Sequence, residues 1–299
     1  MNIYYEVHGN GYPIILLHGN QENRKIYDQL VKDLENDYQL IAMDSRYHGK
    51  SIKSGPLTLD RMAQDVVDVA NELDLEAYDV IGFSDGANIA LTLAGKDERL
   101  KHMVLLSPNA TPKGIKWFYR LHMYMTLLLL PIFCIYDKRS RIRFKLISFM
   151  TKEPHFTADY LSELKIPALL LSGENDVIKD SDFTFIQSSL PYCVHKVIKG
   201  SPHFLLGDQY DKTLREGIID TLDSYKDLDY DVVEIRLDFY EGLKEGHLTN
   251  VLEEIKKHTD KLVLGTIRTV SEGGEGELTS LEYMHYIKAI CDAHVDLVD

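Results

Sequence analysis

Residues 80–87 read VIGFSDGA, and Gly82-Phe83-Ser84-Asp85-Gly86 within them fits the pattern G-x-S-x-G. An apolar, strand-like run at 78–83 precedes Ser84, and a helix-like run at 88–94 follows it. A serine on so tight a strand-to-helix turn is held in a strained, exposed position, and small neighbours let the backbone pass. The turn also places Ser84 at a helix N-terminus, where free amides favour negative charge. The stretch therefore predicts a nucleophilic serine, although the pattern alone is common by chance.

The composition is that of an ordinary globular protein with room for one large domain or two smaller ones. The chain has 299 residues, of which 44% are hydrophobic and 27% charged. Its net charge of -14 argues against nucleic acid or an anionic membrane as the main partner, because both need a basic surface. Three widely spaced cysteines, Cys134, Cys193 and Cys291, predict neither a disulfide framework nor a zinc site. We expect no metal and no cofactor.

One apolar stretch, residues 121–136, is the candidate for a membrane-spanning helix. It is shorter than the ~20 residues of a spanning helix, and Pro131 interrupts it. The following KRSRIRFK, residues 138–145, could touch anionic lipid, but a hydrophobic cap over a pocket is the preferred interpretation. No signal-peptide pattern follows Met1. We therefore expect a cytoplasmic protein without stable membrane insertion, whose oligomeric state the sequence leaves open.

Strand and helix signals alternate along most of the chain. Helical patterns at 24–35, 57–73 and 211–225 separate runs of strand-like residues at 3–7, 13–17, 39–43, 78–83, 102–106, 167–172 and 194–198. Such alternation predicts an α/β fold with a mostly parallel sheet covered on both faces, with ligands at the carboxyl ends of its strands. We expect four parts: the core at 1–109 and 161–225, a helical lid at 110–160, and a separate segment at 226–299.

Three further motifs follow predicted strands. They are His18-Gly19-Asn20, the D-x-R-x-x-G-x-S run at 44–51, and Gly173-Glu174-Asn175-Asp176 with Pro202-His203 after the next strand. Together with the turn at Ser84, they make residues 1–225 resemble the α/β-hydrolase family. The resemblance implies a lidded α/β-hydrolase fold and a serine hydrolase.

The expected catalytic triad is Ser84, Asp176 and His203, in that order along the chain. A serine hydroxyl is a weak nucleophile at neutral pH, so a neutral imidazole must take its proton. His203 is preferred because it lies on a loop between the last strand and helix. Asp176 would orient the imidazole, and Asp180 is the alternative acid.

The backbone amides of Asn20 and Asp85 are the expected oxyanion hole, by resemblance to the family. His18 would brace the oxyanion loop, His48 lies in the turn motif, and His195 lies within a strand pattern and is expected to be structural.

A serine nucleophile, rather than an aspartate, argues against epoxide hydrolysis and dehalogenation. It leaves a carboxylic ester, thioester or related acyl bond, cleaved through an acyl-enzyme. Hydrolysis of a diketone-type carbon–carbon bond and a non-catalytic binder remain alternatives. The Ser84-Asp85-Gly86 run resembles the branch containing valacyclovir hydrolase and the biphenyl-hydrolase-like proteins. Asp85 could accordingly bind a substrate ammonium, or it could merely satisfy the helix dipole.

The lid is expected to present an apolar underside to the substrate. Trp117, Met123 and Leu127 are the residues we expect to contact an acyl or aromatic group, although the same pattern fits the lid's own core. Lys116 or Arg120 could meet an acidic substrate.

The last part of the chain has a different character. DVVEIRLD at 231–238 and GTIRTVSEGGE at 265–275 resemble successive barrel strands of type I 3-dehydroquinate dehydratase. By that resemblance the substrate-side residues are Glu234, Arg236, Arg268 and Glu272. The family's catalytic histidine and Schiff-base lysine lie further along than Asp299.

A closed barrel needs ~250 residues, and residues 226–299 cannot supply them. We therefore expect an incomplete (β/α) barrel fragment without dehydratase activity, as in a fusion or a truncated reading frame. This segment carries 8 Lys/Arg against 17 Asp/Glu, so a generic acidic appendage is one alternative. A bifunctional hydrolase–dehydratase known only in part is the other.

Overall fold

The computed structural model of the protein describes residues 3–135, 137–207, 232–236, 262–266 and 297–298. The chain forms two compact units, Met1–Leu222 and Asp223–Asp299. Each unit is described below by itself.

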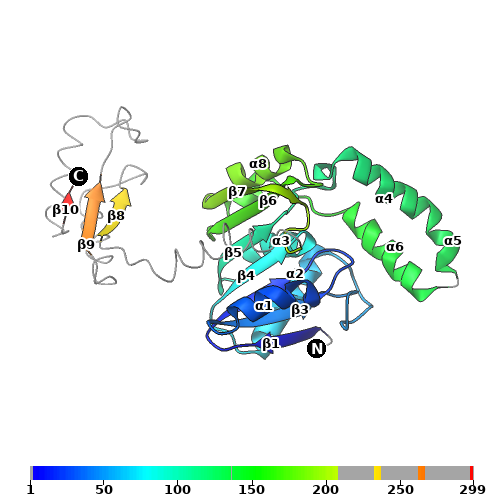
Figure 1. The fold of residues 1–299 in the computed structure, drawn as a ribbon, viewed down its shortest axis with the longest axis horizontal. Helices are drawn as coiled ribbons and strands as arrows, with labels where there is room; N and C mark the ends of the chain where they lie inside the picture. Colours follow the sequence, from blue (N-terminus) through cyan, green and yellow to red (C-terminus); the bar gives the residue numbers. More distant parts are fainter. Residues whose placement is uncertain (1–2, 136, 208–231, 237–261, 267–296, 299) are drawn as a thin grey trace. The chain divides into compact units, whose positions relative to one another are not determined.

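The first unit is built on a seven-stranded sheet with the order β1-β3-β2-β4-β5-β6-β7 (Figure 1). β1 runs antiparallel to β3, and all other neighbouring strands are parallel. The strands are β1 (Tyr4–His8), β2 (Tyr12–Leu17), β3 (Tyr38–Asp44), β4 (Tyr78–Phe83), β5 (Leu100–Leu106), β6 (Ala168–Asn175) and β7 (Cys193–Pro202). The predicted α/β architecture with a mostly parallel sheet is thus confirmed.

Both faces of this sheet are apolar and buried, because alternate side chains of a strand point to opposite faces. In β2, Ile15 and Leu17 belong to one hydrophobic cluster, whereas Ile14 and Leu16 belong to the other. The first cluster is covered by α2 (Leu59–Glu72), α3 (Asp85–Ala94) and α8 (Asp180–Ser189), and the second by η1 (Arg24–Tyr27) and α1 (Asp28–Leu34). The inner strands of the sheet, β2 to β6, are therefore covered on both faces, whereas the edge strands β1 and β7 are partly exposed.

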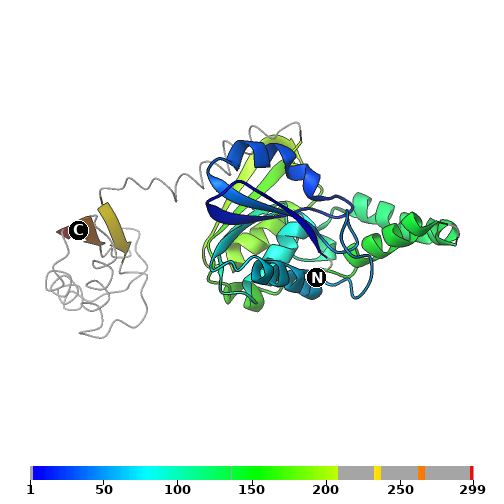
Figure 2. The same cartoon turned by 90° about the horizontal axis from the view of Figure 1, so that it is seen from below.

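The chain between β5 and β6 forms the helical insertion expected at 110–160. It contains η2 (Pro112–Gly114), α4 (Trp117–Leu129), α5 (Pro131–Cys134), α6 (Lys138–Met150) and α7 (Ala158–Ser162). α4, α5 and α6 form a helical hairpin that projects away from the sheet (Figures 1 and 2). No helix in the described parts of the chain combines the length and apolarity needed to cross a membrane.

The described part of the second unit is a three-stranded parallel sheet with the order β10-β9-β8. Its strands are β8 (Val232–Arg236), β9 (Leu262–Thr266) and β10 (Leu297–Val298). Parallel neighbours are the arrangement expected of successive barrel strands. Glu234 and Arg236 lie in β8, whereas Arg268, Glu272 and the helix expected at 211–225 lie outside the described residues.

The loop after β3 is anchored to α2 by a buried ion pair. Arg46 donates from Nε and Nη2 to the two carboxylate oxygens of Asp65, at 2.6 and 2.7 Å. Both side chains are only 5% exposed. Because an unpaired buried charge is far more costly than a paired one, this ion pair should tie the loop to the helix.

We expect Asp65→Ala to lower the free energy of unfolding by about 3–5 kcal/mol, because it leaves the Arg46 guanidinium buried without its carboxylate. Urea denaturation followed by circular dichroism measures the change. The control is Asp60→Ala on the same helix, whose 76% exposed side chain pairs with Lys96 at the surface. That variant should lose less than about 1 kcal/mol. Equal losses in the two variants would contradict the anchoring role.

Candidate active site

The turn between β4 and α3 holds Ser84 in a strained backbone conformation, with φ 52° and ψ -115°. The flanking glycines are needed because other backbone lies against them. A Cβ on Gly82 would lie 2.4 Å from the carbonyl oxygen of Gly86. A Cβ on Gly86 would lie 1.9 Å from the carbonyl oxygen of Leu17 in β2. Close packing of β2, β4 and α3 therefore requires glycine at both positions and presents Ser84 at the edge of the sheet.

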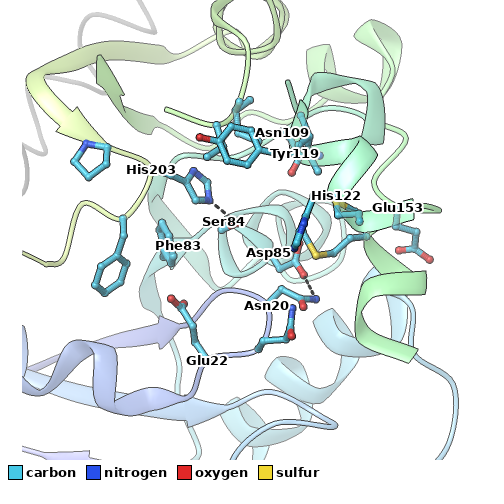
Figure 3. A pocket seen from close by; sticks show the side chains of 18 of the residues that line it. Asn20, Glu22, Phe83, Ser84, Asp85, Asn109, Tyr119, His122, Glu153 and His203 are labelled. Carbon is cyan, nitrogen blue, oxygen red and sulfur yellow. Dashed lines mark hydrogen bonds between the residues drawn. The ribbon is translucent and has the colours of Figure 1, made fainter. Parts of the chain in front are cut away.

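The structure brings Ser84, His203 and Asp176 together, and Figure 3 shows the contact between Ser84 and His203. His203 Nε2 lies 3.2 Å from Ser84 Oγ, and His203 Nδ1 lies 2.7 Å from Asp176 Oδ1. With the Nδ1 proton donated to the carboxylate, Nε2 is left as the acceptor for the serine hydroxyl. Within the described residues, the carboxylate hydrogen-bonded to His203 is that of Asp176 and not that of Asp180.

The Asp176 carboxylate is buried but well supplied with hydrogen bonds. Burial raises its pKa, but hydrogen bonds from His203, the Ile178 amide (2.9 Å) and Ser107 Oγ (2.6 Å) outweigh burial and hold the pKa below its ordinary value. Asp176 is therefore ionised at neutral pH, as an acid that must stabilise an imidazolium has to be.

Two residues near Asp176 have roles that the sequence did not indicate. Lys116, considered as a contact for an acidic substrate, donates from Nζ to the Asp176 backbone carbonyl at 2.6 Å and so supports this turn. Ser107, which donates to the Asp176 carboxylate, was not identified from the sequence as a site residue. Ser107 directly follows β5, so it lies at the carboxyl ends of the strands, as do Ser84 and Asp176. This position in the sequence could have identified Ser107 as a site residue.

Two buried histidines hold the loop that follows β2, residues 18–22, which is called the oxyanion loop here because it contains Asn20. His18 Nδ1 lies 2.7 Å from the Gly19 carbonyl oxygen, and its Nε2 accepts the Ser45 amide at 3.0 Å. His48 Nε2 accepts the Gln21 amide, also at 3.0 Å. Burial lowers the pKa of His18 to about 4 and that of His48 to about 3. Both rings are therefore neutral at physiological pH, which keeps each Nε2 available as an acceptor.

The two amides expected to form the oxyanion hole are available for a ligand. Within residues 3–135 and 137–207, neither the Asn20 nor the Asp85 backbone N–H donates a hydrogen bond. The Asp85 amide is at the first residue of α3, where helix geometry leaves N–H groups without intrahelical acceptors.

A cavity of about 500 Å³ lies beside Ser84 and is mostly apolar. Helix α4 of the lid contributes Tyr119, His122 and Met123. His122 and Met123 follow Tyr119 by three and four residues, about one helical turn, so the three side chains lie on one face of α4. Met123 thus lines the cavity as expected, but Trp117 and Leu127 do not. Trp117 lies on the opposite side of α4 and is 66% exposed, and Leu127 is a further turn towards the tip of the hairpin.

One side of the cavity is acidic. Asp85 is buried, and its Oδ2 accepts Asn20 Nδ2 at 2.8 Å. Burial raises the pKa of the Asp85 carboxyl to about 6, despite the Asn20 hydrogen bond. Asn20 Oδ1 is itself buried without a hydrogen-bond partner in the described residues.

Glu22 and Glu153 also line the cavity, and neither was identified from the sequence (Figure 3). Glu22 Oε2 accepts the Gly19 amide at 3.1 Å, and burial raises the pKa of this carboxyl to about 7. Glu22 lies four residues after His18 in the same loop, and this closeness to the predicted His18-Gly19-Asn20 motif could have identified it from the sequence. Glu153 reaches the cavity from the end of the lid, which no local pattern indicates.

Comparisons with known proteins support an α/β-hydrolase fold for the first part of the chain. Residues 12–125 match the family model described as alpha/beta hydrolase fold, and residues 212–299 match that of type I 3-dehydroquinase. A putative non-heme chloroperoxidase of Synechocystis sp. is 33% identical over 127 residues, which are 38% of this chain and 46% of that protein. Esterase YbfF of Escherichia coli is 36% identical over 90 residues, covering 29% and 35% of the two chains.

A 3-dehydroquinate dehydratase of Staphylococcus haemolyticus is 38% identical over 77 residues, covering 25% of this chain and 32% of that enzyme. The chain thus spans less than half the length of each of these relatives. Among solved structures, the putative non-heme bromoperoxidase BpoC of Mycobacterium tuberculosis superposes with a TM-score of 0.64 at 18% identity, over 75% of this chain and 96% of that one. The first unit therefore has the α/β-hydrolase fold, its residues 12–125 match the model of that family, and residues 212–299 match the model of type I 3-dehydroquinase.

Proposed function

We propose that this protein is a serine hydrolase that cleaves a carboxylic ester, thioester or related acyl bond through an acyl-enzyme. The observation that carries the proposal is the continuous contact from Ser84 Oγ through the His203 ring to the buried, ionised Asp176. The same constellation makes serine nucleophilic on several unrelated folds.

The geometry supports the following reaction. His203 Nε2 takes the Ser84 hydroxyl proton as Oγ attacks the acyl carbon, and the carbonyl oxygen becomes an oxyanion facing the Asn20 and Asp85 amides. The tetrahedral intermediate collapses, and His203 returns the proton to the leaving alcohol or thiol. Water, deprotonated by His203, then attacks the acyl-enzyme, and the released Ser84 Oγ recovers its proton. Each oxyanion amide typically contributes roughly 3 kcal/mol to the transition state.

The acidic side of the cavity favours substrates that carry an ammonium group. Asp85, Glu22 and Glu153 all line the cavity. A cation bound there would reduce the cost of burying these carboxylates, whereas a substrate carboxylate would be repelled. The lid contributes an apolar wall through Met123. An aminoacyl ester with an apolar side chain fits both halves of the cavity.

We expect Ser84→Ala to lower kcat for p-nitrophenyl esters by about 10⁴–10⁶-fold, because it removes the nucleophile. A fluorophosphonate probe should label the wild-type protein once, at the tryptic peptide containing Ser84, and should not label the variant. Ser188→Ala, an exposed serine on α8, should retain full activity and labelling. Equal hydrolysis by wild type and Ser84→Ala would disprove the catalytic proposal and leave a non-catalytic binder.

We expect Asp85→Asn to lower kcat/KM for an α-amino ester by about 10–100-fold, because it removes a charge-assisted hydrogen bond. The des-amino ester of the same shape should change much less. In the wild type, the ratio of the two kcat/KM values should fall as the pH is lowered through about 7 and then about 6, where Glu22 and Asp85 successively take up protons. A titration that affects both substrates equally cancels in the ratio.

The matched control for this experiment is Glu174→Gln. Glu174 is an exposed carboxylate at the end of β6 and is not among the residues that line the cavity. It should leave the ratio unchanged. If Asp85→Asn reduces hydrolysis of both esters equally, the carboxylate supports the oxyanion loop instead of binding an ammonium.

A further inference from the structure

The lid hairpin, defined here as residues 116–145, exposes an unusual amount of apolar surface. Of the sixteen large hydrophobic side chains that are exposed in the described residues, eleven belong to it. The most exposed are Trp117 (66%), Leu128 (69%) and Ile135 (71%), and Ile132 and Phe133 lie between the last two. Monomeric soluble proteins seldom leave so many large apolar side chains exposed in one short segment, so this concentration indicates a binding surface.

The same segment is strongly basic within an acidic chain. Residues 116–145 contain seven Lys/Arg and a single acid, Asp137, whereas the whole chain has 33 Lys/Arg against 47 Asp/Glu. Five of the basic side chains, all exposed, lie on α6: Lys138, Arg139, Arg141, Arg143 and Lys145. α6 begins only a few residues after the apolar helix α5. The apolar tip of the hairpin is therefore bordered by cations.

The fold accounts for Lys145, whose ammonium lies over the Tyr47 ring, but neither for the apolar tip nor for the concentration of cations on α6. The hairpin projects from the sheet, so the core of the first unit does not cover its tip (Figures 1 and 2). A second copy of this chain docked tip to tip would place two cationic surfaces against each other, which is unfavourable. A nucleic acid would suit the cations but would leave the apolar side chains exposed. An apolar face with basic residues beside it fits the interface of a bilayer that carries negative charge.

We propose that the lid hairpin docks peripherally on an anionic lipid surface. The side chains at the end of α4 and on α5 enter the acyl boundary, and the basic residues of α6 contact the phosphate groups. α4 also lines the catalytic cavity through Tyr119 and Met123, so the docking element and the cavity wall are the same helix. The inference rests on the surface alone and does not depend on the proposed hydrolysis.

The test uses the full chain with vesicles of phosphatidylcholine alone or mixed with phosphatidylglycerol. We expect the protein to sediment with the mixed vesicles much more than with the neutral ones, and to be released as salt is added. Trp117, the chain's only tryptophan, begins α4 at the end opposite the docking tip. In a Trp117→Phe background, Phe133→Trp therefore reports binding, and its emission should shift to shorter wavelength with the mixed vesicles. Far-ultraviolet circular dichroism checks that each variant is folded.

Two pairs of substitutions separate the two contributions. Arg139→Gln with Arg143→Gln should weaken binding to the mixed vesicles by about fivefold per charge. Ile132→Ser with Phe133→Ser should weaken it by about tenfold or more, because buried apolar area is lost. The control pair is Val194→Ser with Val197→Ser, which are 59% and 54% exposed on the edge strand β7. This pair should bind like the wild type.

The proposal is overturned if the full chain does not bind the mixed vesicles, or if the control pair weakens binding as much as the hairpin pairs do. It is also overturned if sedimentation equilibrium shows a dimer that does not bind vesicles and that Ile132→Ser with Phe133→Ser dissociates. In that case the hairpin is an interface between copies of this chain.

Discussion

The structure depends on one close contact, between the backbone of Gly86 at the start of α3 and the carbonyl oxygen of Leu17 at the end of β2. It is possible only without a side chain at residue 86, and it brings α3 close to the sheet. Ser84 is then forced to positive φ at the edge of the sheet, with its own amide bound to Leu106 in β5 at 2.8 Å. The same contact sets the amide of Asp85 beside the oxyanion loop that follows β2.

Parallel strands explain how residues far apart in the chain meet at this point. The carboxyl ends of parallel strands lie at one edge of a sheet, so the residues that follow them become neighbours. Asp176 comes from the end of β6, His203 follows β7, and Ser107 follows β5. Ser107 donates a hydrogen bond to the Asp176 carboxylate, and Lys116 donates one to the Asp176 backbone carbonyl. The triad is thus positioned by the sheet and not by any one loop.

Charge is distributed unevenly over the hydrolase part of the chain. The oxyanion loop is held by histidines that burial keeps neutral, so its hydrogen bonds do not depend on pH in the physiological range. Three carboxylates line the cavity beside Ser84, whereas the lid hairpin that forms another part of its wall carries exposed cations on α6. The proposed ammonium-binding cavity and the proposed lipid-docking surface therefore share one helical element.

Local sequence determined the alternation of strands and helices, the turn at Ser84 and the choice of Asp176 and His203. Each of these rests on a short motif or on the periodicity of apolar residues. Tertiary structure alone decided that Glu22 and Glu153 line the cavity and that Trp117 is exposed. It also decided that Lys116 hydrogen-bonds to the backbone of Asp176. These outcomes depend on the direction of α4 and on contacts between distant residues, and no short-range pattern contains that information. The burial that shifts the pKa of Asp85 likewise exists only once the sheet, the oxyanion loop and the lid have packed around it.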